Sequence, residues 1–89
     1  MYRILFTAKS IKSLKKLPKS IQAKTDLLVD ILIIDYRDNR LKAKKLNTNQ
    51  SLFSFRVTKD YRVVFMFANS STIKVLDIKH RKDIYKKLK

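Results

Sequence analysis

Three arginines, a tyrosine and a histidine in the second half of the chain are of the residue types that bind and cleave a phosphodiester. Arg56 and Arg62 fall in two runs that are typical of neighbouring strands, and His80, Arg81 and Tyr85 follow a third run. Arginine presents a planar fork of donors to non-bridging phosphate oxygens and stays charged at any relevant pH. Such donors stabilise charge on phosphorus in a transition state, and a tyrosine can stack on a base or transfer a proton. The same arginines could equally be solvated residues of a charged face.

The overall charge indicates a polyanionic partner. The 89 residues contain 22 Lys and Arg against 7 Asp and Glu, which gives a formal net charge of +15. This excess increases the self-repulsion of the folded chain, which a nucleic acid, an anionic membrane or an acidic protein would relieve. The hydrophobic fraction of 45% is typical of a globular domain and not of a disordered basic tail. We therefore predict one globular domain over residues 1–89.

The residue types that are missing exclude several classes of site. The sequence has no cysteine and a single histidine, so it predicts no disulfide, no thiolate zinc site and no metal centre. It has no glycine, which excludes the glycine-rich phosphate loops of nucleotide-cofactor enzymes. No apolar run approaches the roughly 20 residues of a membrane span, and Lys9 and Lys12 interrupt the N-terminal run too early for a signal peptide. We therefore expect a cytoplasmic protein with no cofactor and no membrane partner.

The first half of the chain predicts a strand followed by a helical hairpin. Residues 2–7 are rich in aromatic and branched side chains, as in a short strand. From Ala8 to Leu17 the apolar residues recur at helical spacing, and Pro18 ends this helix and can open the next one. The second helix is predicted from about residue 19 to about residue 36. Its apolar stripe comprises Ile21, Leu28, Ile31 and Leu32, with Leu27 and Ile34 at the margins.

The second half predicts three strands. A polar, unpatterned loop over residues 38–50 carries a basic cluster: Arg40, Lys42, Lys44 and Lys45. Alternating apolar residues then predict strands over residues 52–57, 61–68 and 72–78, and the basic tail 81–89 is expected to end as a short helix. The order β-α-α-β-β-β predicts an α+β domain in which the helical hairpin packs on one face of a mostly antiparallel sheet. The other face, where Arg56 points outward, would be available to a ligand.

Three segments of this half resemble the RelE/ParE toxin superfamily, and its RelE-like branch in particular. They are FSFRV (53–57), DYRVVF (60–65) and IKHRKDIY (78–85), and Lys45-Leu46 upstream adds to them. RelE-type toxins have a strand ending in Leu-Arg, a Tyr-Arg-Val-Ile-Tyr strand and an Ile-Gly-His-Arg-x-x-Val-Tyr close. With the element order included, the resemblance covers nearly the whole chain.

The resemblance implies a toxin of a type II toxin–antitoxin system, an endoribonuclease that cleaves mRNA in the ribosomal A site. The attacking group would be the 2′-hydroxyl of the message, with no metal. The implied catalytic residues are Arg62 at the phosphate, Arg81 at the transition state or leaving oxygen, and Tyr85 in stacking or proton transfer. The implied RNA-binding residues are Arg56, Lys42, Lys44, Lys45 and His80. The implied partners are mRNA, the ribosome with its 16S rRNA, and an acidic antitoxin.

The chain departs from the family where some members carry catalytic lysines, because it has Leu52 and Ser54 there. The general base is therefore open among Tyr85, His80 and a lysine of the 42–45 segment. Two other functions also stay open. A ParE-like toxin that inhibits DNA gyrase is favoured by the missing lysines and disfavoured by the complete Arg, Arg, Tyr set. A basic RNA-binding domain without catalysis would bind by charge alone.

Overall fold

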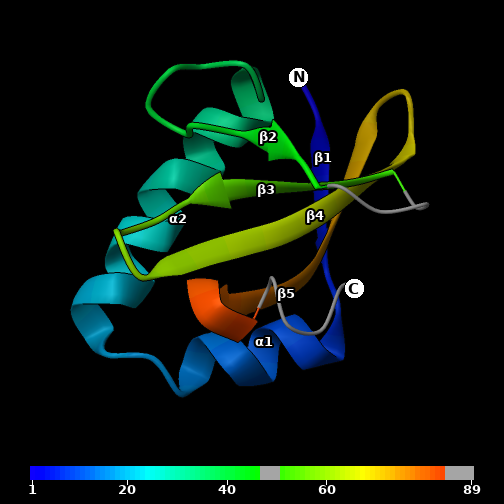
Figure 1. Cartoon of the computed structure of the whole chain (residues 1–89). Coiled ribbons are helices and arrows are strands. Elements are labelled where there is room, and N and C mark those ends of the chain that lie inside the picture. Colours follow the sequence, from blue (N-terminus) through cyan, green and yellow to red (C-terminus); the bar gives the residue numbers. More distant parts are fainter. Residues whose placement is uncertain (47–50, 84–89) are drawn as a thin grey trace.

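The structure, a computed structural model, describes residues 1–46 and 51–83. These residues form two helices and a five-stranded sheet. In chain order, the elements are β1 (Arg3–Phe6), α1 (Ala8–Lys15), α2 (Lys19–Ile34), β2 (Lys44–Lys45), β3 (Leu52–Arg56), β4 (Tyr61–Asn69) and β5 (Thr72–His80) (Figure 1). Residues 81–83 begin a helical segment after β5. The strands that the alternation predicted are all present, with ends that differ by one or two residues.

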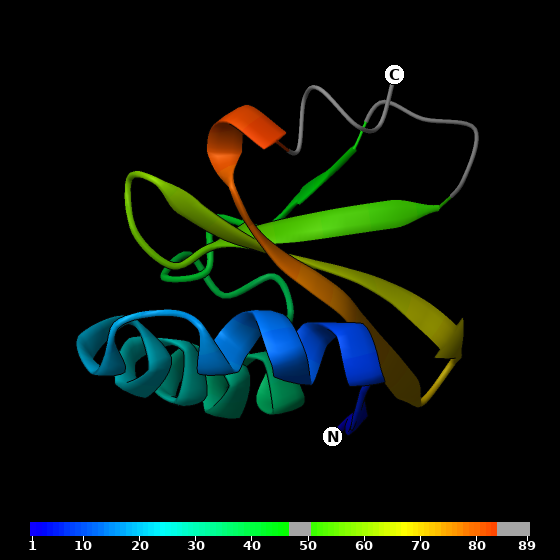
Figure 2. The ribbon, with the colours of Figure 1, turned by 90° about the horizontal axis from the view of Figure 1, so that it is seen from below.

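The sheet has the order β1-β5-β4-β3-β2. β1 runs parallel to β5, and the other neighbouring strands are antiparallel. Both helices lie on the same side of the sheet (Figure 2). The predicted α+β architecture, with a helical hairpin on a mostly antiparallel sheet, is confirmed.

Local sequence explains where the helices begin and end. The Thr7 hydroxyl caps α1 by accepting a hydrogen bond from the Ser10 N–H at 3.0 Å. Pro18 precedes α2 at its N-cap position, as the break in the pattern predicted. α2 ends at Ile34 and not at Tyr36. There the Asp35 side chain accepts a hydrogen bond from the Arg37 N–H at 2.9 Å, a local turn that competes with further helical hydrogen bonds.

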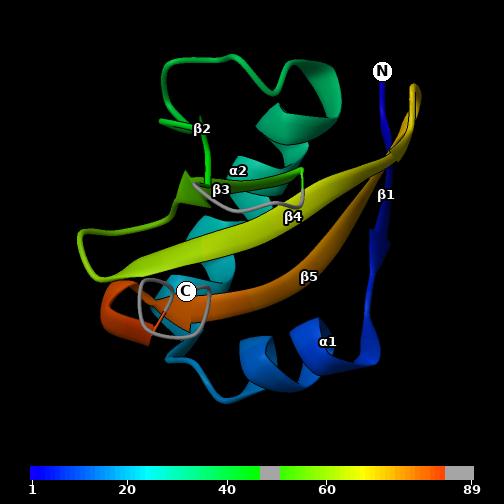
Figure 3. The same cartoon turned by 45° about the vertical axis from the view of Figure 1, so that its right-hand side comes forward.

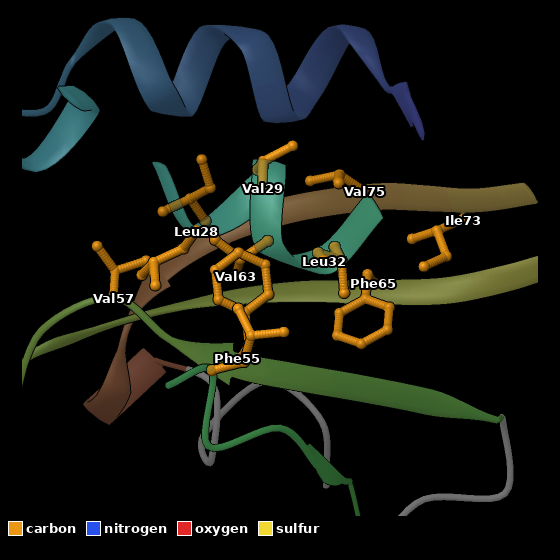
Figure 4. Close-up of a cluster of buried hydrophobic side chains, with 11 residues drawn as sticks. Leu28, Val29, Leu32, Phe55, Val57, Val63, Phe65, Ile73 and Val75 are labelled. Atoms are coloured by element: carbon orange, nitrogen blue, oxygen red, sulfur yellow. The ribbon is translucent and has the colours of Figure 1, made fainter. Parts of the chain in front are cut away.

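The main core lies between α2 and the sheet (Figure 4). From α2 it takes Leu28, Val29 and Leu32, which pack with sheet residues that include Phe55, Val63 and Phe65. The main stripe predicted for α2 is confirmed, because Leu28 and Leu32 are buried and Ile21 and Ile31 pack against the core, but the residues at its margin differ. Val29 is buried, whereas the predicted margin residues Leu27 and Ile34 are 66% and 69% exposed. Position 29 shares a helical face with 25, 28 and 32, and position 27 does not.

The 38–50 segment is not entirely a loop, because Lys44 and Lys45 form the edge strand β2 and pair with Ser54 and Phe53 of β3. Two charged residues show no apolar alternation, so the pattern could not reveal this strand. Exposed lysines are typical of a protected sheet edge. The face of the sheet away from α2 also carries a small cluster of its own: Leu46, Leu52 and Val64, with Met66 and Leu76 against it. That face is therefore only partly open to a ligand.

Candidate functional site

A row of three cationic residues crosses the sheet on the face away from α2. Arg56 of β3 is in register with Arg62 of β4, and Arg62 is in register with Lys79 of β5. Register partners project from the same face, and like charges that face each other across strands destabilise the sheet. A bound anion would offset this repulsion.

The row ends at a cavity whose lining is basic throughout. The cavity has a volume of about 350 Å³ and is lined by Arg56, Lys59, Arg62, Arg81 and Lys82. Its lining residues come in part from the turn between β3 and β4 and from the start of the helical segment after β5. Figure 3 shows these two segments of the backbone close together. The Arg81 N–H donates to the Asp60 carbonyl at 2.7 Å and holds these two segments together. This arrangement suits a phosphate, since arginine and lysine donors surround the space that it would fill.

Arg62 is fixed in this cavity by its own hydrogen bonds. Its Nε donates to the Ser54 Oγ at 2.9 Å and its Nη2 to the Lys42 carbonyl at 3.0 Å. Ser54 is fully buried, and Arg62 is only 9% exposed. The plane of the guanidinium is therefore set before any ligand arrives, as donors for a transition state need to be. The role of Ser54 was missed at the sequence level, although strand alternation does place it on the face of Arg56.

The segment before β2 is shaped to meet Arg62. Lys42 has φ 48°, in the left-handed region that a residue with a Cβ seldom adopts. This segment is also tied to the end of β3, because the Arg56 N–H donates to the Leu41 carbonyl at 2.8 Å. Lys42 therefore contributes to the cavity through its backbone carbonyl oxygen, which accepts the hydrogen bond from Arg62. The sequence did not predict this role.

The structure brings together Arg56, Arg62 and Arg81 of the predicted site residues. Lys44 and Lys45 lie exposed on β2 at the sheet edge and do not line the cavity. His80 is opposite Tyr61, with ring centroids 5.6 Å apart, and therefore points to the other face from Arg62. Its Nδ1 accepts a hydrogen bond from the Lys82 N–H at 3.3 Å, which supports the cavity wall. Tyr85 lies outside the described residues.

A buried carboxylate holds Lys79 beside Arg62. Asp77 accepts a hydrogen bond from the Ser13 hydroxyl at 2.7 Å and lies 3.3 Å from the Lys79 Nζ and 3.6 Å from the Lys9 Nζ. Burial raises the pKa of Asp77, but hydrogen bonds from Ser13, the Ile78 N–H and Lys79 together bring it below its usual value. Asp77 thus ties α1 to β5. The sequence analysis missed it, along with Lys59, Lys79 and Lys82, although alternation from Arg81 places Asp77 and Lys79 on one face.

Residues 1–46 and 51–83 contain no group of three or more His, Cys, Asp or Glu side chains that could hold a metal ion. No helix in these ranges is both long and apolar enough to cross a membrane.

Comparison with known proteins gives a family and a fold. The family model described as "ParE toxin of type II toxin-antitoxin system, parDE" matches residues 4–85. In the solved RelE–RelB complex of Pyrococcus horikoshii OT3, the matching chain is 28% identical, with 90% of this chain and 94% of that chain covered and a TM-score of 0.75. In the RelB–RelE complex of Methanococcus jannaschii, the matching chain is 25% identical. The match covers 96% of this chain and 99% of that chain, with a TM-score of 0.76.

A more distant structure has the same fold. The match in the E. coli RelBE complex is 15% identical, covers 90% of this chain and 96% of that chain, and has a TM-score of 0.73. No curated protein sequence matches the chain. With a family model that spans residues 4–85 and these structural neighbours, the chain belongs to the ParE toxin family, and is a type II toxin of the RelE/ParE superfamily with a RelE-like fold.

Proposed function

We propose that the protein is a ribosome-dependent endoribonuclease that cleaves mRNA in the A site. The observation that carries this proposal is the cavity lined by five basic residues, with Arg62 already fixed in its wall. A site of this composition can bind a phosphodiester and stabilise the charge that develops during its cleavage.

In the proposed reaction, the 2′-hydroxyl oxygen of the message attacks the neighbouring phosphorus. The 2′-hydroxyl gives its proton to a general base as a bond forms between its oxygen and phosphorus. The bond from phosphorus to the 5′-oxygen of the next nucleotide breaks, and this oxygen takes up a proton. The products are a 2′,3′-cyclic phosphate and a 5′-hydroxyl, so neither a metal nor a covalent enzyme intermediate is required. The ribosome would hold the message in the geometry that in-line attack needs.

The roles follow from position in the cavity. Arg62 would donate to the non-bridging oxygens, since its guanidinium is held in one plane. Arg81, on the segment after β5, would stabilise the transition state or the leaving oxygen, and Arg56 would bind the RNA backbone. Tyr85 is the proposed stacking or proton-transfer residue. Lys44 and Lys45 on the edge strand would contact RNA outside the cavity, and His80 would support the cavity wall through Lys82.

We also propose an acidic antitoxin as partner. Two of the structural neighbours, from Methanococcus jannaschii and E. coli, are named as complexes of a toxin with its antitoxin. A protein of net charge +15 with a basic cavity would be inhibited by an acidic segment that fills that cavity.

A second candidate function is inhibition of DNA gyrase. It is favoured by one observation, namely that the matching family model is that of the ParE toxins. A gyrase inhibitor has no need of the arrangement around Arg62, so the two functions differ in their dependence on the cavity.

Induced expression in cells, followed by mapping of mRNA 5′ ends, separates the two. Cuts within codons that require translation, and that are lost in Arg81→Ala and reduced in Tyr85→Phe, support the ribonuclease. Arg3→Ala is the matched control, because it removes the same side chain from the exposed surface of β1, outside the cavity. Growth arrest without cuts, equal in all four proteins, would support gyrase inhibition instead.

A further inference from the structure

A second basic cavity adjoins the first. It has a volume of about 270 Å³, and its basic lining residues are Lys24, Arg40, Lys42, Arg56 and Lys59. They come from α2, from the segment that follows it, from β3 and from the β3–β4 turn. Arg40 forms an ion pair with Asp38, because its Nε and Nη2 donate to the two carboxylate oxygens at 3.0 and 2.9 Å. Lys24 and Lys42 are therefore the residues that best distinguish this cavity from the first.

The two cavities adjoin, because Arg56 and Lys59 line both of them, and together we call them the basic groove. The residues that line it extend from Arg81 after β5 to Lys24 in α2. A ligand that fills both cavities must therefore be extended and carry negative charge at more than one point.

Lys42 links the two cavities through its backbone. Its carbonyl holds Arg62 in the first cavity, while the residue itself lines the second. The left-handed backbone that allows both is unfavourable for a residue with a Cβ. A lysine at a position that favours glycine is explained if its side chain binds a ligand in the second cavity.

We propose that the second cavity binds another phosphodiester of the RNA strand whose scissile phosphate occupies the first. This inference rests on the proposed function and extends it, since it makes a single RNA strand longer than a dinucleotide the preferred ligand. An RNA strand carries one negative charge per nucleotide and so supplies anions to both cavities whatever its sequence. An acidic protein segment has carboxylates only where its sequence places them.

The test uses Lys24→Gln and Lys42→Gly in the full chain. Lys42→Gly keeps the carbonyl that holds Arg62 and removes only the side chain, and glycine adopts this backbone without strain. The probes are a dinucleotide and a longer single-stranded oligonucleotide, both 2′-O-methylated so that 2′-hydroxyl attack cannot occur. Fluorescence anisotropy gives their Kd over a series of salt concentrations. Lys12→Gln in α1 removes the same charge away from the groove and serves as control.

Each variant should weaken binding of the long oligonucleotide about two- to fivefold, as for an exposed charge contact. Each should also lower the slope of log Kd against log salt by about 0.7, as for one lost phosphate contact to a single strand. Binding of the dinucleotide should stay within twofold of wild type in Lys24→Gln, whose side chain lines only the second cavity, an effect smaller than about 0.4 kcal/mol.

An equal loss in Lys12→Gln would overturn the inference, because net charge alone would then explain the effect. So would unchanged RNA affinity in both variants together with weaker binding to polyglutamate, which would assign the cavity to an acidic protein. Either result leaves the proposed ribonuclease standing if wild type still cleaves and Arg81→Ala does not. If wild-type protein bound neither oligonucleotide, the proposed function and this inference would both fail.

Discussion

The Ser54 hydroxyl should contribute to both stability and cleavage, because it holds Arg62 in the cavity. Ser54 is fully buried and accepts a hydrogen bond of 2.9 Å from the Arg62 Nε. Ser54→Ala removes this acceptor and leaves a charged donor unsatisfied in a site where Arg62 is only 9% exposed. A hydrogen bond to a charged group contributes about 1.5–3 kcal/mol. We take about 2 kcal/mol as the expected loss in the free energy of unfolding, since the bond to the Lys42 carbonyl remains.

That loss corresponds to a fall in Tm of about 8–16 °C for a domain of this length. The loss of cleavage should also be large, because a guanidinium held by fewer hydrogen bonds donates in a less fixed direction. Small misplacements of a catalytic group reduce rates by up to about 100-fold. Circular dichroism melting measures the first effect, and cleavage of ribosome-bound mRNA below the melting range measures the second.

Ser51→Ala is the matched control, since it deletes the same hydroxyl from an exposed position just before β3. It should stay within about 0.5 kcal/mol of wild type. If Ser54→Ala were as stable and as active as Ser51→Ala, the claim that Ser54 fixes Arg62 would be wrong.

Three further predictions follow from the same contacts. Arg62→Lys keeps the charge but loses the planar fork, so the kcat for cleavage should fall about 100- to 1,000-fold, as when one transition-state donor is lost, and an unchanged kcat would refute the role of Arg62. Asp77→Asn should be less stable than wild type at pH 7. Because the folded pKa of Asp77 is lowered, its contribution is present above the unfolded value of about 3.9 and is lost as pH falls through the folded pKa. Urea denaturation should therefore show the two proteins converging below about pH 4, and a constant difference down to pH 2 would contradict this. Leu32→Ala, at a fully buried position, should cost about 2–5 kcal/mol in urea denaturation, whereas the exposed Leu27→Ala should cost less than about 0.5 kcal/mol, and equal costs would refute the observed orientation of α2.

Much of this architecture follows from local patterns in the sequence. Alternation of period two predicted β3, β4 and β5, and Pro18 separated the two helices at the correct place. The same alternation put Arg56 and Arg62 on adjacent strands of one sheet, where the register now pairs them directly.

Features that depend on contacts between distant residues could not be predicted in this way. The bonds from Arg62 to the Lys42 carbonyl and from Arg81 to the Asp60 carbonyl join segments about 20 residues apart, and no local pattern indicates them. The burial of Val29 in place of Leu27 depends on which side of α2 packs on the sheet, and the exposed Leu27 has the same hydrophobicity as a core residue. Lys79 was not recognised because its role depends on Asp77, which is itself held by Ser13 of α1.

The central claim is most directly tested by incubating purified protein with ribosomes that carry a defined message in the A site. We expect cleavage within the A-site codon that leaves a 2′,3′-cyclic phosphate and a 5′-hydroxyl. Both Arg81→Ala and a single 2′-deoxynucleotide at the cut position should abolish this cleavage. An intact message under these conditions, together with inhibition of gyrase supercoiling by the same preparation, would contradict it and assign the protein to the gyrase-inhibiting toxins.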